Sequence, residues 1–195
     1  MSPVKARRPR AVAVILSVLL TASCASPPLS LYTLRPSDVP AATVPFSRPG
    51  AVIEIRRVVL PDYLDSQDIL VRNGNTLQRS PHGRWASRLS IEVTRYLTGL
   101  LAARRPNALI TDQPPVETPS DRILITISNL DVTTAGRATL QADWTIVPHN
   151  SAEPIRGQRA VFTVNGPANT DQDVVVLMQS LLTRLADAID IAHLR

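Results

Sequence analysis

The chain contains a single cysteine, Cys24, among its 195 residues. A lone cysteine cannot form an internal disulfide, so a disulfide that stabilises the fold is excluded. The thiol can still be free, bridge to another chain, or carry a covalent modification. The sequence on either side of Cys24 distinguishes between these roles.

Residues 1–23 have the three-part layout of a secretory signal peptide. A basic start leads into an apolar run over residues 11–20, and the small residues Ala22 and Ser23 stand directly before Cys24. About ten apolar residues are too few to cross a bilayer, which takes roughly 20. The segment resembles the lipobox of bacterial lipoproteins, with Thr21 where leucine is most common. We therefore expect cleavage before Cys24 and acylation (palmitate and related chains) of its thiol and new amino group.

Acylation of Cys24 predicts a durable membrane anchor. One acyl chain binds a membrane only marginally, whereas two or more hold firmly. The residues after Cys24 are Ala25 and Ser26 rather than aspartate. By resemblance to bacterial sorting rules, this implies transfer to the outer membrane, with the domain facing the periplasm.

The net charge of +5 overstates how basic the anchored chain is. Four basic residues and no acidic residue lie within residues 1–23, which leaves 17 basic and 16 acidic residues after cleavage. No basic stripe with interleaved aromatic residues is present, so a nucleic-acid partner is not expected.

Residues 24–50 are expected to form a lipidated N-terminus and an extended tether. Six prolines fall in this stretch, and proline fixes φ and removes a hydrogen-bond donor. At about 3.1 Å per residue, the segment would reach roughly 60–80 Å from the membrane. The strand-like residues 31–34 interrupt it, and their pairing with the sheet of the domain would shorten this reach.

Residues 51–195 predict one α+β domain, with a largely antiparallel sheet and two helices packed on one face. Asn73-Gly74 between two short extended segments predicts a β-hairpin. Apolar residues at three- and four-residue spacing predict a helix over residues 85–104 and a second one that begins near Asp171. Strands are expected over residues 51–60, 123–134, 137–147 and 158–164.

The sequence offers little support for catalysis or for a bound cofactor or metal. The three histidines, His82, His149 and His193, are far apart and have no cysteine or carboxylate at ligand spacing. Asp62, Asp65 and Asp68 lack the alternating spacing and the glycine of a calcium loop, so a solvated loop is expected there. We therefore expect a binding or assembly component rather than an enzyme.

The order of several short motifs is similar to that of the ABC-type transport auxiliary lipoproteins. These motifs are Leu31-Tyr32-Thr33-Leu34, Leu60-Pro61-Asp62-Tyr63-Leu64-Asp65, Ile69-Leu70-Val71-Arg72, Arg84-Trp85-Ala86 and the terminal helix over residues 172–194. The resemblance implies partnership with a mammalian-cell-entry (MCE) domain protein and its ABC permease and ATPase. Such systems move lipids between the two membranes of Gram-negative bacteria. It also leaves open assembly of the chain as a homo-oligomer.

Four residues are candidates for partner contact, each with a structural alternative. Tyr63 and Leu64 either form a docking edge or fold back onto the core. Trp85 either anchors a partner or packs in the core, and Arg84 either pairs with a lipid phosphate or is solvated. An alternative function from another class is activation of a periplasmic cell-wall enzyme.

Overall fold

The computed structural model describes residues 28–35 and 50–189, so Cys24, the expected signal peptide and His193 lie outside the described residues. The elements in chain order are β1 (Ser30–Tyr32), β2 (Val52–Ile55), β3 (Asp68–Asn73), β4 (Thr76–Trp85), α2 (Leu89–Arg104), β5 (Leu109–Thr111), β6 (Asp121–Val132), β7 (Arg137–Pro148), β8 (Arg156–Asn165) and α3 (Asp171–Ala188).

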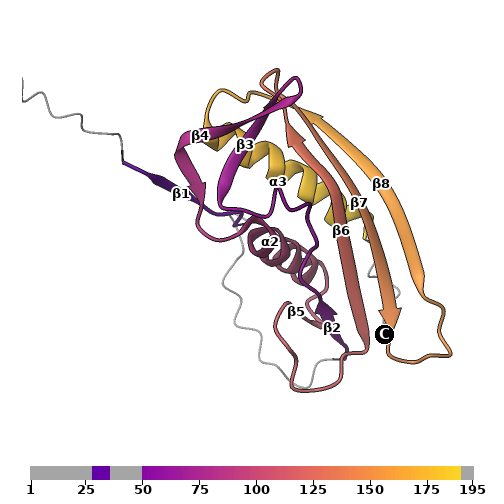
Figure 1. Cartoon of the computed structure of the whole chain (residues 1–195). Coiled ribbons are helices and arrows are strands. Elements are labelled where there is room, and N and C mark those ends of the chain that lie inside the picture. Colours follow the sequence, from indigo (N-terminus) through magenta and orange to yellow (C-terminus); the bar gives the residue numbers. More distant parts are fainter. Residues whose placement is uncertain (1–27, 36–49, 190–195) are drawn as a thin grey trace, which may run out of the picture.

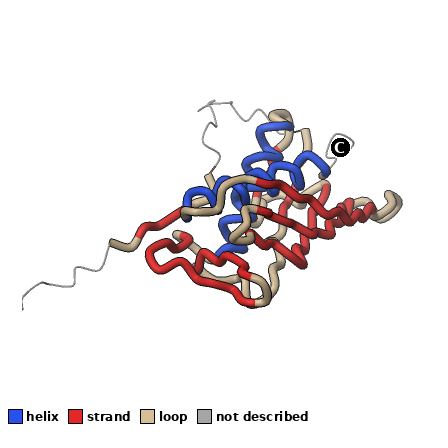
Figure 2. Tube along the Cα trace, turned by 90° about the horizontal axis from the view of Figure 1, so that it is seen from above, coloured by secondary structure: helices blue, strands red, loops and turns tan. Residues whose placement is uncertain are grey.

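The strands form two sheets, and both helices cover one face of the larger sheet. The larger sheet has the order β5-β2-β6-β7-β8, and the smaller one has the order β1-β4-β3. Helix α3 packs on β6, β7 and β8, whereas α2 packs on β5 and on α3 (Figure 1). Seen from above, the helices lie together on one side of the strands (Figure 2). The expected α+β domain with two helices is confirmed.

Both sheets contain parallel as well as antiparallel pairs. The long pairs β6–β7 and β7–β8 are antiparallel, as is the pair β3–β4. By contrast, β2 runs parallel to both β5 and β6, and β1 runs parallel to β4. Because parallel neighbours need a crossover connection, the hairpin and α2 lie between β2 and β5 along the chain.

Strict alternation over residues 121–128 of β6 shows how the larger sheet builds the core. Ile123, Ile125 and Ile127 are buried beneath the helices, whereas Leu124 and Thr126 between them are exposed. Successive side chains of a strand point to opposite faces, so this part of β6 has one apolar face and one solvated face. The outer face of the sheet carries no helix among the described elements.

Strand β1 joins the N-terminal segment to the domain. Ser30 and Tyr32 pair in register with Gly83 and Trp85 of β4, and the Ala86 N–H donates to the Tyr32 carbonyl over 2.8 Å. The alternative that residues 31–34 pair with the sheet is therefore confirmed. This pairing fixes Ser30–Tyr32 to the domain, which shortens the reach of the expected tether in the way that alternative predicted, while residues 24–27 and 36–49 lie outside the described residues.

The two described helices begin at different kinds of residue. Helix α2 begins at Leu89 and not at Trp85 as expected, because Trp85 is the last residue of β4 and pairs with Tyr32. Helix α3 begins at Asp171 as expected. The Thr170 hydroxyl accepts from the Asp173 N–H, and the Asp173 carboxylate accepts from the Thr170 N–H, which makes a capping box.

The expected hairpin is present, with its turn shifted by one residue. Asn73 pairs with Thr76, so Gly74 and Asn75 form the turn, and Gly74 has a φ of 58°. Glycine adopts a positive φ without the steric cost of a Cβ, which explains why Asn-Gly predicts a turn at this place.

Candidate partner-binding site

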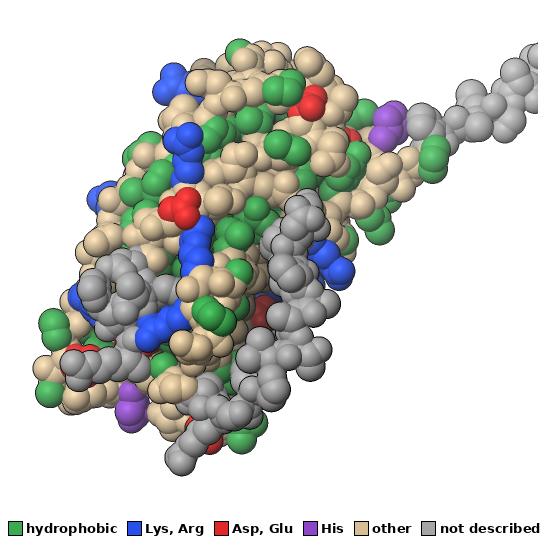
Figure 3. Space-filling model, turned by 180° about the vertical axis from the view of Figure 1, so that it is seen from behind, with side chains coloured by type: hydrophobic (Ala, Val, Ile, Leu, Met, Phe, Trp, Pro, Cys, Tyr) green, Lys and Arg blue, Asp and Glu red, His purple; other side chains and the backbone are tan. Residues whose placement is uncertain are grey.

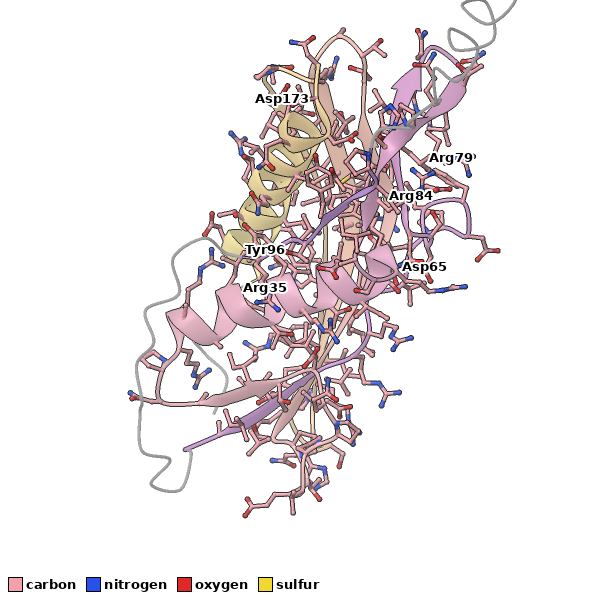
Figure 4. All side chains as sticks on the ribbon, turned by 90° about the vertical axis from the view of Figure 1, so that its left-hand side faces the viewer. Arg35, Asp65, Arg79, Arg84, Tyr96 and Asp173 are labelled. Atoms are coloured by element: carbon pink, nitrogen blue, oxygen red, sulfur yellow. The ribbon has the colours of Figure 1, made fainter. Side chains whose placement is uncertain are left out.

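The fold brings together the two segments that contain the candidate contact residues. The loop over residues 61–67 lies against the end of β4, where the Trp85 N–H donates to the Gln67 carbonyl over 2.7 Å. One residue further on, Asp68 of β3 pairs with Arg84 of β4. Asp65 and Arg84 accordingly lie on the same side of the molecule in Figure 4.

Leu64 and Trp85 belong to the core and do not reach the surface. Leu64 is 2% exposed and Trp85 is 0% exposed. Burial of a leucine or tryptophan side chain contributes about 1.5–3 kcal/mol or more, so these side chains hold the loop and the end of β4 in place. For both residues, core packing and not partner contact is what the structure shows.

Tyr63 is the exposed apolar residue of the loop, with 44% of its surface accessible. Beside it, the Arg72 guanidinium donates to both carboxylate oxygens of Asp131, over 2.8 and 3.0 Å. Partial burial raises the pKa of the Tyr63 hydroxyl, and the nearby Asp131 carboxylate adds to this shift, against the opposing effect of Arg72. Tyr63 is therefore a neutral phenol with one face in solvent, next to an ion pair that joins β3 to β6.

The Arg84 guanidinium is largely occupied by contacts within the domain. Its Nε lies 3.1 Å from the Asp68 carboxylate, and its Nη1 donates to the carbonyls of Ser80 and Gly83, each over 2.6 Å. Its side chain is 23% exposed. The residue is thus neither fully solvated nor free to enclose a phosphate, and its main role is to hold the bulge over residues 80–83.

Asp65 caps α2 from a distance, a role that the sequence did not reveal. The N-cap residue Arg88 makes no capping bond through its side chain, but Oδ1 of Asp65 accepts from the Ser90 N–H over 3.2 Å. Burial alone would raise the pKa of Asp65, but the donors of Ser90 and Arg88 outweigh it and the pKa is lowered. Asp65 is therefore a charged cap at the positive end of the helix dipole.

An open cleft of about 440 Å³ lies between the residues that follow β1 and the first turns of α2. At its base is Glu92, which is 5% exposed and accepts hydrogen bonds from the Leu34 N–H and the Ser87 hydroxyl. The rest of its polar lining consists of Thr33, Arg35, Arg95 and Tyr96, and Figure 4 shows Arg35 beside Tyr96. Sequence reasoning missed this cleft, because Glu92 and Leu34 are 58 residues apart.

No group of three His, Cys, Asp or Glu side chains within residues 28–35 and 50–189 is placed to hold a metal ion. Asp65 and Asp68 pair instead with arginines, and both His82 and His149 lie near the surface. No helix of the described part of the chain is long and apolar enough to cross a bilayer.

The molecule is thus a small α+β domain that presents a fixed surface loop. Residues 32–190 match the model of the ABC-type transport auxiliary lipoprotein component family, so the chain belongs to that family. The expected family is thereby confirmed, and with it the class of membrane-anchored lipoproteins associated with ABC-type transport.

Two solved structures are similar to this fold. One is an uncharacterized protein with 14% sequence identity and a TM-score of 0.68, matched over 83% of this chain and 96% of that chain. The other is protein XCC0632 from Xanthomonas campestris, with 15% identity and a TM-score of 0.59, over 82% of this chain and 92% of that chain. At these identities the likeness supports the fold alone. No curated protein matches the chain.

Proposed function

We propose that this protein is an outer-membrane lipoprotein that docks an MCE-domain protein of an ABC-type lipid transport system, without a catalytic role. The proposal rests on two features found in one chain: residues 32–190 belong to the transport auxiliary lipoprotein family, and a lipobox-like segment precedes Cys24. The lipid anchor fixes the domain to one membrane, and the partner provides the connection to the permease and ATPase in the other.

The loop over residues 61–67 is the proposed docking surface, with Tyr63 as its contact residue. The Leu64 and Asp65 N–H groups both donate to the Pro61 carbonyl, over 2.9 and 3.1 Å, so the loop is closed on itself. A tyrosine on a loop that is already ordered loses little conformational entropy on binding, which is why such residues contribute strongly to interfaces.

A photo-crosslinking residue at position 63 of the full-length lipoprotein tests this surface. We expect a crosslink to the MCE-domain protein in intact cells, and a much weaker one from position 161 on β8. Val161 is a suitable control because it is 61% exposed, at least as accessible as Tyr63. Equal yields from both positions, or no crosslink to an MCE-domain protein from either, would contradict the proposal.

The anchor is tested separately by metabolic labelling with palmitate. Label should enter the wild-type protein and be absent from Cys24→Ala, which should also leave the membrane fraction. Label that persists in this variant would exclude Cys24 as the acylated residue.

The same crosslinks distinguish the remaining alternatives. A crosslink from position 63 to a penicillin-binding protein would favour activation of a cell-wall enzyme instead. A crosslink between two copies would identify the loop as a contact within a homo-oligomer, and the MCE-domain protein would then dock elsewhere.

A further inference from the structure

Two large apolar side chains, one directly before β1 and one within it, are exposed to solvent at the start of the described chain. Leu29 is 59% exposed and Leu31 is 63% exposed. The two leucines are two residues apart, the spacing at which side chains of an extended chain point to the same side. Figure 1 shows β1 leading away from the body of the domain, and Figure 3 shows hydrophobic side chains on this projecting arm.

The residues immediately after these leucines hold β1 firmly to the domain. Leu34 is 2% exposed, and its N–H donates to the buried Glu92 carboxylate over 3.2 Å. The Arg35 carbonyl accepts from the Gln179 side chain of α3 over 3.1 Å. The position of Leu29 and Leu31 relative to the two helices is therefore fixed.

The length of chain that precedes β1 limits how far these leucines can be from Cys24. Leu29 follows Cys24 by five residues. A fully extended chain spans at most about 3.3–3.6 Å per residue, so the two Cα atoms are at most ~18 Å apart. The polar layer on each side of a bilayer is itself about 5–8 Å thick. An acylated Cys24 thus keeps β1 close to the head groups of its leaflet.

The charges beside β1 balance one another. Leu31 pairs in register with Arg84, and Asp68 pairs with both Arg84 and Arg79. Asp171 adds a second carboxylate, because the Ser80 hydroxyl donates to it over 2.8 Å and a Cβ on Gly83, the register partner of Ser30, would meet it. The exposed leucines, and not a charged surround, are therefore what suits this end of the sheet to a membrane interface.

We propose that the β1 end of the smaller sheet rests on the leaflet that holds the acyl chains of Cys24, with Leu29 and Leu31 inserted at the boundary between head groups and acyl chains. This inference rests on the acylation that the proposed function requires. It adds an orientation for the domain: the smaller sheet faces the lipid, and the outer part of the larger sheet, including β8, faces away.

Site-specific fluorescence on the full-length lipoprotein tests this orientation. In the acylated protein the Cys24 sulfur is bonded to lipid, so Leu31→Cys adds a unique free thiol for an environment-sensitive dye. Val161→Cys is the matched control, because Val161 is 61% exposed and Leu31 is 63% exposed. Both proteins are reconstituted in vesicles of phosphatidylethanolamine and phosphatidylglycerol that contain spin-labelled lipid.

We expect lipid quenching at position 31 to exceed that at position 161 by about threefold or more, since interfacial side chains lie ~5–10 Å into the head-group boundary. Equal quenching at the two positions would overturn the inference. A dye at position 31 of the unacylated Cys24→Ala protein that is shielded from aqueous iodide in buffer without detergent would also overturn it, because a protein surface would then cover β1.

The mass of the N-terminal peptide from the same preparation separates the two levels of the argument. An acylated Cys24 with equal quenching would refute the orientation while the anchor stands. An unmodified Cys24 would refute the anchor itself, and the orientation with it.

Discussion

The Leu34 backbone N–H donates a hydrogen bond to Oε2 of Glu92 over 3.2 Å. The other carboxylate oxygen of Glu92 accepts from the Ser87 hydroxyl, and the side chain is 5% exposed. One buried acid therefore joins the N-terminal segment to α2 and to the turn that precedes it. This segment also follows Cys24, the proposed site of acylation, in the sequence.

Replacement of Glu92 should loosen the N-terminal segment. Glu92→Ala leaves a buried N–H and a hydroxyl without their acceptor, so we expect the free energy of unfolding to fall by about 2–3 kcal/mol. Glu92→Gln keeps an acceptor for Leu34 and should cost about 1 kcal/mol or less. Urea unfolding and amide exchange of residues 32–35 measure the effect. An exposed control, Glu117→Ala, should change little, and a similar result for Glu92→Ala would contradict the role of this contact.

Asp65 should stabilise α2 in a pH-dependent way. Asp65→Ala removes a capping acceptor and should cost about 1 kcal/mol, whereas Asp65→Asn retains the hydrogen bond and loses only the charge. Because the pKa of Asp65 is lowered from 3.8, the advantage of aspartate over asparagine is present above that pH and disappears as the pH falls below it. Asp62→Asn in the same loop is the control, and a constant difference from Asp65→Asn across this range would count against the charged cap.

Asp121 should have the opposite effect on stability. Burial raises the pKa of its carboxyl above 3.8, and Glu153 adds to the shift, against donation from the Ser120 hydroxyl. The folded protein therefore binds this proton more tightly than the unfolded chain does, and ionisation at higher pH costs stability. Asp121→Asn should be more stable than the wild type at neutral pH and should lose this advantage below pH 3.8. Chemical denaturation at both pH values measures it, and a variant less stable at neutral pH would refute the prediction.

Gly136 should tolerate no side chain. Its φ is 80°, and a Cβ there would lie 2.0 Å from the Gly166 carbonyl oxygen. Gly136→Ala should therefore lower the free energy of unfolding by about 2 kcal/mol or more. Gly157→Ala is the matched control, because its added Cβ would meet nothing closer than 3.6 Å and its effect should stay within about 1 kcal/mol. Thermal unfolding of both variants compares them, and equal melting temperatures would be the contrary result.

Local patterns in the sequence predicted much of the secondary structure, but not which distant segments contact one another. Asn73-Gly74 predicted the hairpin because positive φ is a local requirement, met at Gly74. The predicted start of helix α2 at residue 85 was wrong. Trp85 and Leu89 are four residues apart, as apolar residues on one face of a helix are, and this spacing extended the predicted helix too far. The backbone of Trp85 is nevertheless held in β4 by Tyr32 and Gln67, which are distant in sequence.

The candidate site could be predicted only in part, for the same reason. The motif around Tyr63 pointed to the right loop, but no local signal shows that Leu64 is buried while Tyr63 is exposed. Strand β5 is three residues long, too short for periodicity to detect, and its parallel pairing with β2 depends on the crossover through α2. Likewise, the roles of Asp65 and Glu92 depend on contacts across 25 and 58 residues.

The parallel pairing of β1 with β4 would have a mechanical consequence if Cys24 is acylated as proposed. Tension applied at the N-terminus along the axis of β1 would load the bonds between Ser30–Tyr32 and β4 together and not one after another. Bonds loaded in shear resist tension better than bonds that open in sequence. Three residues of strand would then act as a clamp between the proposed anchor and the domain.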